Sequence, residues 1–236
     1  MSPSDRDILA GWSRLGIAWN VPPADSTLDV ERLLLRSLSE VPGNARMIVL
    51  VASWLSVYWR CVGRDRLAVL AQAATVREQA TLGVLLETVD EWLPTAVFTG
   101  LRGELARMDE AEPLLRMDRQ RPALARLAEL EASAVSRRWG LWCLPIERKL
   151  EAVRPADWTW HINPALRIRS FFKGALKTSL LSAMDAREGG KLSITGLARE
   201  CGVTRKAVYD AMEDLQFSKL AACHAAKSPR PSSAKP

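Results

Sequence analysis

Two amphipathic helical patterns separated by a single break occupy the segment from Ser193 to Gln216, and they restrict this stretch to a pair of short helices. Ala198 lies where two such helices would cross, a place where only a small side chain fits. Gly202 lies at the break, where the chain needs a residue that adopts positive φ without strain. The apolar positions expected to face inward are Leu197, Cys201, Val203, Val208 and Ala211.

The small residue, the turn glycine and the apolar spacing together resemble the helix-turn-helix of bacterial transcription regulators. The resemblance covers 193–216, or 164–216 with the preceding helix, and the rest of the chain carries none. A helix, a short β-prone link and two further helices also resemble the order of elements in winged-helix domains. After Leu215, however, the sequence contains no pair of alternating strands and no turn glycine for a wing. The resemblance therefore implies a helix-turn-helix domain over 164–220 whose wing is reduced or absent.

In the motif that this segment resembles, the second helix enters the major groove and its first residues reach the base edges. Thr204 would be the N-cap of that helix, whose free amides and positive dipole end also suit a phosphate. Arg205 would pair with guanine O6 and N7, whereas Lys206 would contact either a guanine or a phosphate. Tyr209, one turn later, would touch a thymine methyl group or a phosphate.

Contacts to the DNA backbone are expected from the first helix of the pair, at Ser193, Thr195 and Arg199. The preceding helix is expected to begin at Pro164 with Asn163 as its N-cap, and Gly174 is a candidate break within it. Cations that recur on one side of that helix would add nonspecific attraction, and they are Arg167, Arg169, Lys173 and Lys177.

The distribution of charge supports a polyanionic partner for the C-terminal part. From residue 164 onward, 13 Lys and Arg accompany 6 Asp and Glu, a net charge of +7, whereas the first 163 residues hold 20 and 21, a net charge of −1. A neutral domain beside a basic one is the pattern expected when one segment binds nucleic acid. A solvated basic surface without that role is the alternative interpretation.

The N-terminal half is predicted to be an all-helical domain over 27–140, preceded by an arm over 1–26. Its first helix is expected over 28–41, with Ser26 or Thr27 as the N-cap. The uncharged run between Arg46 and Arg60 is too short for a bilayer, which requires about 20 apolar residues. It is therefore predicted to be a buried central helix, with a membrane-dipping segment as the alternative.

Further helices are expected over 64–74, 75–92 and 122–140, and a short one is possible between 101 and 112. No convincing strand appears in this half, so the fold class is all-α. A connector over 141–163 follows, and four of the nine tryptophans lie in or next to it. These rings are expected to pack across the helical domain, with a base-stacking or ligand platform as the alternative. Residues 221–236 have the composition of a disordered tail.

No constellation of catalytic residues is found, so the chain is not expected to be an enzyme. The only histidines, His161 and His224, have no cysteine or acid at metal-ligand or triad spacing, and no phosphate-binding loop or nucleophile elbow occurs. The four cysteines are scattered without a CxxC pair, which disfavours a metal site or disulfide framework. No cofactor is expected. The acidic N-terminal segment does not have the pattern of a signal peptide, and a reducing cytoplasm is the expected compartment.

These patterns lead to the hypothesis of a cytoplasmic DNA-binding transcription regulator that acts on double-stranded DNA through its C-terminal domain. Homodimerisation is expected because one such helix reads few bases. The domain over 27–140 would supply dimerisation, ligand sensing or a surface for a protein partner, and no membrane association is expected. The alternative is an interaction protein, such as an antitoxin-like or defence-system accessory component, whose basic module only assists localisation.

Overall fold

A computed structural model of the protein describes residues 3–25, 28–186 and 193–217. This part of the chain contains fourteen α-helices, three short 3-10 helices and two strands of two residues each. The strands pair in parallel, with Glu112 opposite Leu141 and Pro113 opposite Trp142. The expected all-α class is therefore confirmed.

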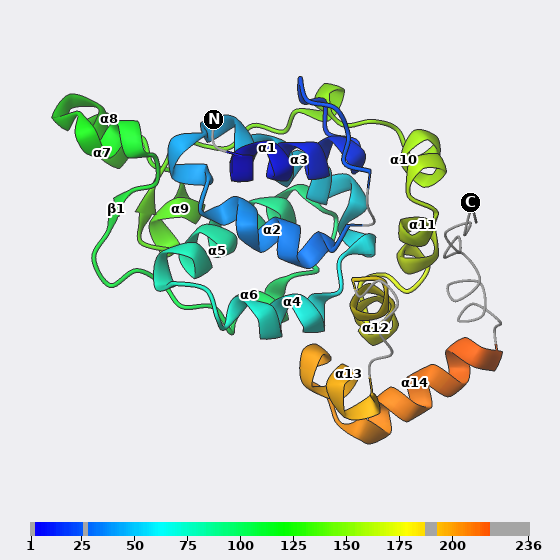
Figure 1. Ribbon diagram of the computed structural model, residues 1–236. Coiled ribbons are helices and arrows are strands. Elements are labelled where there is room, and N and C mark those ends of the chain that lie inside the picture. Colours follow the sequence, from blue (N-terminus) through cyan, green and yellow to red (C-terminus); the bar gives the residue numbers. More distant parts are fainter. Residues whose placement is uncertain (1–2, 26–27, 187–192, 218–236) are drawn as a thin grey trace.

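The helices fall into a body and a smaller C-terminal group (Figure 1). Those of the body are α1 (Pro3–Arg14), α2 (Val30–Leu38), α3 (Ala45–Tyr58), α4 (Arg64–Ala71), α5 (Val76–Trp92), α6 (Thr99–Arg102), α7 (Arg116–Gln120), α8 (Pro122–Leu130), α9 (Ala134–Arg138) and α10 (Ala156–Ile162). The C-terminal group consists of α11 (Pro164–Ser170), α12 (Leu176–Asp185), α13 (Ile194–Cys201) and α14 (Arg205–Phe217). The short elements are η1 (Val41–Gly43), η2 (Trp59–Cys61), η3 (Leu150–Ala152), β1 (Glu112–Pro113) and β2 (Leu141–Trp142).

Helix α3 runs through the centre of the body and is buried on nearly every side, as predicted for the uncharged run. It packs against α5, and its Trp54 is completely buried with the indole Nε1 donating to the carbonyl oxygen of Leu15 at 2.8 Å. The hydroxyl of Ser53 donates to the carbonyl of Val49, so burying this hydroxyl costs little free energy. None of the described helices is both long and apolar enough to cross a membrane.

Helix α5 begins where the sequence indicates, because Thr75 and Glu78 form a reciprocal capping box at its first turn. Gly83 lets α5 approach the indole of Trp139, since a Cβ at this position would lie only 2.3 Å from the ring. Trp139 is almost fully buried, and its Nε1 donates to Glu87 Oε2 at 2.6 Å. The predicted packing role is thus confirmed for this tryptophan of the connector region.

The N-terminal segment is more than the predicted arm. Trp12 of α1 is fully buried and donates to the hydroxyl of Ser37 at 2.7 Å, and Ile8 and Leu15 belong to the same apolar core. Helix α1 is therefore part of the body, because a buried indole with a hydrogen-bond partner is stable in its core.

Two predicted helices differ in length from the observed ones. The helix expected over 28–41 is α2, which starts at Val30 with Asp29 as the N-cap and ends at Leu38, before the 3-10 turn η1. The predicted caps Ser26 and Thr27 lie outside the described residues. The helix expected over 122–140 is divided into α8 and α9, because Ser133 caps a new helix by accepting from the amide of Ser136.

The short helix that the sequence allowed between 101 and 112 does not form. Helix α6 ends at Arg102, and the chain continues irregularly to β1. Asp90 holds the start of this stretch, because its carboxylate accepts from the amides of Val97 and Phe98 and from Arg102. The sequence between 101 and 112 gives no sign of these contacts, because Asp90 lies outside that stretch.

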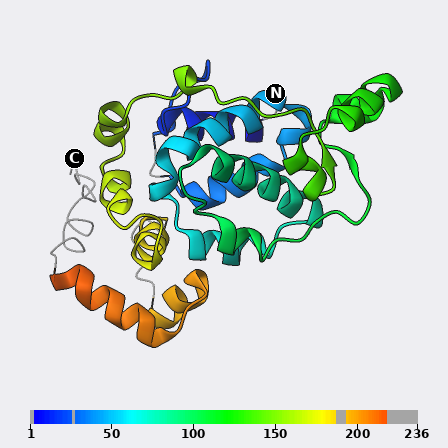
Figure 2. The same cartoon turned by 180° about the vertical axis from the view of Figure 1, so that it is seen from behind.

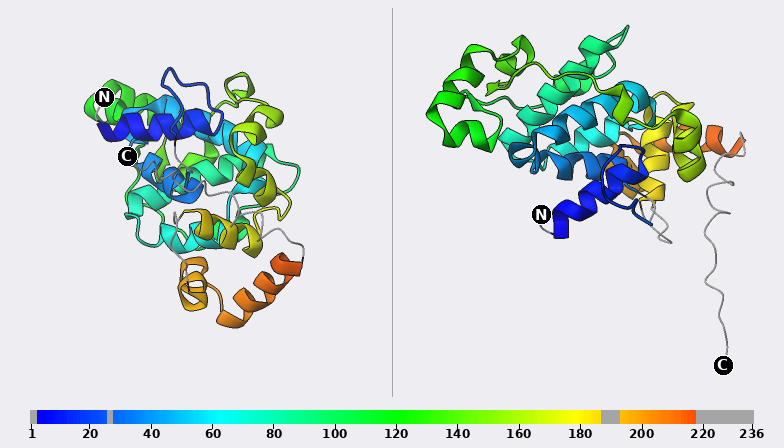
Figure 3. Two further views of the ribbon diagram at one scale, coloured as in Figure 1. Left: turned by 45° about the vertical axis from the view of Figure 1, so that its right-hand side comes forward. Right: turned by 90° about the horizontal axis from the view of Figure 1, so that it is seen from above.

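Helices α12, α13 and α14 have a small apolar core of their own, formed by Leu180, Ala183, Leu197, Ala198, Cys201, Val208 and Ala211. Leu166 of α11, in contrast, belongs to the core of the body. Helix α14 projects beside α12 and α13, whereas α7 and α8 protrude from the body at the other end of the molecule (Figures 1, 2 and 3).

Candidate nucleic-acid interface

The pair formed by α13 and α14 has the local geometry that its sequence predicts. Ser193 is the N-cap of α13 and accepts from the amide of Gly196 at 3.1 Å. Gly202 ends the helix in the left-handed conformation with φ of 66°, and its amide and that of Val203 donate to the last carbonyl groups of α13. A Cβ at Gly202 would also lie 2.6 Å from Val69 Cγ2 of α4, so the turn approaches the body closely.

The inward positions of the pair are largely as predicted. Leu197, Ala198, Cys201, Val208 and Ala211 are buried, and only Val203 remains half-exposed. They contact Leu180 and Ala183 of α12, so α12 is the third helix of this group. Leu215, which is also buried, extends the inward face of α14 by one further turn.

The first turns of α14 present the predicted contact residues to solvent. Thr204 accepts from the amide of Ala207 at 3.2 Å, which places its side chain at the helix N-terminus as expected. Arg205 and Lys206 are exposed, and Tyr209 is 61% exposed. Lys206 Nζ lies 2.9 Å from Asp210 Oδ2, but both side chains are so exposed that this pair can open at little cost.

On α13, Thr195 and Arg199 are exposed as predicted for backbone contacts. Ser193 is exposed too, although its hydroxyl oxygen already serves as the helix cap. Neither Arg199 nor Arg205 forms an ion pair within the part of the chain that the structure describes. These two guanidinium groups are the cations of the pair that are most available to an anion.

The cations predicted on the preceding helix do not form one face. Arg169 was wrongly placed on the outside, because its side chain is 1% exposed and its Nη2 lies 2.5 Å from Asp185 Oδ2. Arg167 and Lys173 are exposed, whereas Lys177 is paired with Asp214 of α14 at 2.7 Å. The periodicity is broken at Gly174, as the sequence indicated.

The turn before α12 is held by the body. Gly174 adopts φ of 73°, and its carbonyl oxygen accepts from the amide and the Nε of Arg64. The Gly174 amide in turn donates to the carbonyl of Arg60 at 3.1 Å. Helix α12 therefore starts from a point that is fixed on the body.

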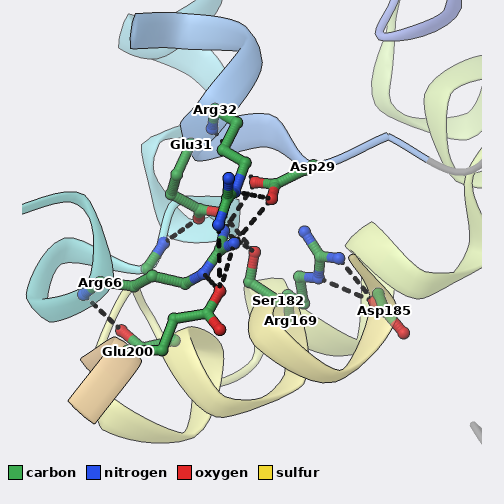
Figure 4. A network of polar contacts seen from close by, with 10 residues as sticks. Asp29, Glu31, Arg32, Arg66, Arg169, Ser182, Asp185 and Glu200 are labelled. Carbon is green, nitrogen blue, oxygen red and sulfur yellow. Dashed lines mark hydrogen bonds and ion pairs between the residues drawn. The ribbon is translucent and has the colours of Figure 1, made fainter. Parts of the chain in front are cut away.

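A buried cluster of charges joins the body to α13 (Figure 4). The side chain of Arg66, on α4, is completely inaccessible to solvent. Its two terminal nitrogens each lie 2.6 Å from an oxygen of Asp29, while Nη1 contacts Glu31 at 2.8 Å and Nη2 contacts Glu200 of α13 at 2.7 Å. We refer to Asp29, Glu31, Arg66 and Glu200 as the Arg66 cluster.

The Arg66 cluster is satisfied by further hydrogen bonds. Glu31 accepts from the amide of Gly63 at 2.6 Å and from the hydroxyl of Ser182 on α12. Burial alone would raise the pKa of Asp29, but the hydrogen bond and charge of Arg66 outweigh this effect and hold it below its ordinary value. Burial opposes the charged form of Arg66, whereas the carboxylates around it raise its pKa. The cluster thus contains ionised groups that stabilise one another.

Sequence reasoning missed the Arg66 cluster. Asp29 and Glu31 have the appearance of ordinary acids near a helix N-terminus, and Glu200 that of a surface residue of the helix pair. Arg66 contacts partners 37, 35 and 134 positions away, so no short-range pattern connects them. Only covariation of these positions among related sequences would reveal the cluster without a structure.

The described cysteines offer no reactive group. Cys61, Cys143 and Cys201 are free and buried. Burial raises the pKa of the Cys61 and Cys201 thiols to about 12 and that of Cys143 to about 11. At these values the thiols stay protonated near neutral pH and behave as small apolar side chains.

The described side chains include no group of three or more metal-ligating residues that could hold a metal ion. What the arrangement offers chemically is an exposed helix N-terminus with cations at its first turns, carried on a three-helix group that buried charges attach to the body. Comparison of the chain with models of protein families, with curated proteins and with solved structures finds no match.

Proposed function

We propose that 164–217 form a winged-helix-like helix-turn-helix that binds double-stranded DNA, with α14 in the major groove, and that the protein regulates transcription. The observation that carries this proposal is the division of α14 into two faces. Val208 and Ala211 are buried against α12 and α13, and Leu215 is buried as well, whereas Arg205, Lys206 and Tyr209 face solvent at the helix start. This is the arrangement that a recognition helix needs.

Within this proposal the contacts have separate roles. Arg205 pairs with a guanine edge, Lys206 with a guanine or phosphate, and Tyr209 with a thymine methyl group or phosphate. Arg199, Thr195 and the exposed cations Arg167 and Lys173 contact the DNA backbone and fix the register. Arg169 takes no part because it is buried against Asp185.

The proposal is tested by titrating a fluorescent duplex from the region upstream of the protein's own gene, with and without unlabelled competitor. Selection of bound genomic fragments supplies the duplex if that region does not bind. If about five phosphates are contacted, affinity falls by a few hundred-fold between 50 and 200 mM salt. If the protein does not bind, or binds all sequences equally, the proposal that it is a transcription regulator is overturned.

Substitutions test the assignment of contacts. Arg205→Ala should remove about 1–3 kcal/mol of preference for the correct base, whereas Arg199→Ala should weaken binding to all sequences alike. Arg36→Ala, which removes an exposed arginine of α2, is the matched control and should change neither. If Arg205→Ala and Arg199→Ala both bind like the wild type, the face assignment is wrong.

One observation favours a second function, in which the helix pair binds a protein. Asp210, Glu213 and Asp214 follow Arg205 and Lys206 on α14, so this helix has three acids and two cations, and its net charge is −1. An acidic C-terminal half opposes close approach to a polyanion. Under this alternative the pair captures a basic protein surface, and Asp210→Asn would weaken that complex instead of strengthening binding to DNA.

A further inference from the structure

A small cavity lies where the end of α1 meets the junction of α10 and α11 (Figure 1). Its volume is about 70 Å³, more than twice the roughly 30 Å³ that one water molecule occupies in the liquid. Leu15 and Leu166 in its wall are buried, whereas Arg14 and Leu28 are half-exposed, so the cavity reaches the surface on their side. The cavity therefore has room for a ligand of a few non-hydrogen atoms and a route by which that ligand enters.

One nitrogen of Arg169, which also lines this cavity, has no hydrogen-bond partner among the described residues. The side chain is 1% exposed, and its Nε and Nη2 donate to Asp185 Oδ2 at 3.1 and 2.5 Å. The remaining nitrogen, Nη1, is buried and lies on the side of the guanidinium group that faces away from Asp185 (Figure 4). Buried donors of a charged group are nearly always satisfied, because leaving one without an acceptor costs free energy. This nitrogen is thus a donor that is free to bind a ligand.

Arg14 brings a second guanidinium group to the same cavity. Its Nε donates to Asn163 Oδ1 at 3.2 Å, and its Nη1 donates to the carbonyl oxygen of Ala24 at 2.7 Å. The Nδ2 of Asn163 donates in return to the carbonyl oxygen of Arg14 at 2.8 Å, which fixes the group at the cavity wall. Among the described residues, Nη2 of Arg14 has no hydrogen-bond acceptor and the side chain has no acidic partner. Arg14 therefore offers a positive charge and a free donor in one orientation.

The charges and the walls of the cavity favour a small organic anion. Asp185 balances the charge of Arg169, whereas that of Arg14 is unbalanced, and no described residue that lines the cavity is acidic. Two guanidinium nitrogens suit the two oxygens of a carboxylate, which arginine binds by charge-assisted hydrogen bonds. The apolar residues of the wall include Leu15, Leu28, Ile162 and Leu166. They suit an alkyl group and disfavour a strongly hydrated anion such as phosphate.

We propose that this cavity binds a small carboxylate of two or three carbons. Its oxygens accept from Nη1 of Arg169 and from Nη2 of Arg14, and its alkyl end lies against the leucines of the wall. A ligand of so few atoms binds weakly, with a dissociation constant on the order of 1 mM. The inference goes beyond the proposed function and does not depend on it, because neither arginine takes part in the proposed contacts with DNA.

Binding is tested by saturation-transfer NMR on the full chain with acetate, whose methyl group reports contact with the protein. Acetate should bind, whereas acetamide, a neutral molecule of the same shape, should bind at least about 10-fold more weakly. Phosphate at about 10 mM should not displace acetate, because the apolar wall does not replace its hydration. Since only the folded chain has the cavity, about 10 mM acetate should raise the thermal midpoint by about 3 °C relative to acetamide at the same ionic strength.

Ala165 also lines the cavity, and enlarging this residue tests the location of the site. Ala165→Val places two methyl groups beside the cavity and should weaken acetate binding at least about 10-fold while the chain stays folded. Ala123→Val, at an exposed alanine of α8, is the matched control. Arg14→Ala should weaken binding about 10-fold because it removes a charged donor, whereas Arg6→Ala, at an exposed arginine of the same helix, should not. Circular dichroism shows whether each variant keeps its helices.

Three outcomes would overturn the inference. The first is that acetate does not bind even at about 50 mM, well above the expected dissociation constant. The second is that acetamide binds as strongly as acetate, or that phosphate displaces it, because the site would then not select a carboxylate. The third is unchanged acetate binding in both Ala165→Val and Arg14→Ala, because acetate would then lie elsewhere. If Arg14→Ala does not fold, Ala165→Val and its control still decide the location.

Discussion

The body and the α12–α14 group are built on different physical principles. The body buries large aromatic side chains, among them Trp12, Trp54 and Trp139, in one continuous core. The core of the α12–α14 group consists mainly of small side chains, and the Arg66 cluster holds α13 against α4 by buried charges. Apolar contacts act without direction, whereas hydrogen-bonded charges require one geometry. We infer that apolar burial sets the stability of the body and that the cluster sets the orientation of α13.

The largest effect is expected in the body. Trp54→Ala should lower the free energy of unfolding by about 3–5 kcal/mol, because it leaves a cavity at a completely buried position and removes a hydrogen bond to Leu15. Urea denaturation followed by circular dichroism measures this loss. Trp158→Ala, at a half-exposed ring, is the control and should cost much less. An equal loss of unfolding free energy in both variants would contradict the larger contribution of the buried Trp54.

The next largest effect is expected where the body and the α12–α14 group meet, at Arg66. Arg66→Met removes the buried cation that three carboxylates share and should cost about 3–5 kcal/mol. Hydrogen exchange should accelerate in α13 more than in α3, since the cluster attaches α13 to the body. Arg32→Met, at a side chain that is 56% exposed and also pairs with Asp29, should cost less than about 1 kcal/mol. Unchanged protection of α13 in Arg66→Met would contradict the attachment.

The same attachment should depend on pH. The pKa of Asp29 is lowered in the folded protein, so its contribution to stability is present above the unfolded pKa of about 3.9 and is lost as the pH falls through the lower folded value. Asp29→Asn should therefore be less stable than the wild type at pH 6, by about 1–3 kcal/mol. The difference should shrink below about pH 4, as thermal unfolding at several pH values would show. A difference that is constant from pH 6 to pH 3 would disprove the ionic contribution.

A smaller effect is expected at the turn between α13 and α14. Gly202→Ala places a side chain at φ of 66° and brings its Cβ towards Val69 of α4, which should cost about 1–2 kcal/mol. Combining it with Val69→Ala should recover part of this loss, which a double-mutant cycle in urea measures. If the two changes are additive, the turn does not touch α4 in solution.

Local features of the fold were predictable from the sequence. The capping box of Thr75 and Glu78, the glycine turn at Gly202 and the cap at Thr204 each depend on residues within a few positions. The burial of α3 followed from its uncharged apolar run, and the buried face of α14 followed from apolar periodicity. The end of α2 and the break between α8 and α9 were missed, because short polar caps such as Ser133 interrupt a pattern that otherwise favours a longer helix.

The candidate interface was predictable only in part. The exposure of Arg205, Lys206 and Tyr209 followed from helical periodicity, and the structure agrees with it. The burial of Arg169 was not predictable, because it depends on Asp185 in the next helix and on the turn at Gly174.

The sequence by itself determined where most helices form, how they are capped and which of their faces are apolar, because these properties arise from hydrogen bonds and periodicity over a few residues. Only the tertiary structure decided that Arg66 is buried among carboxylates from two distant segments, and that Leu127 and Leu130 of α8 remain largely exposed. The burial of a charge is stable only where its partners converge in space, and the exposure of an apolar face depends on what packs beside it. Those conditions are set by the arrangement of the whole chain.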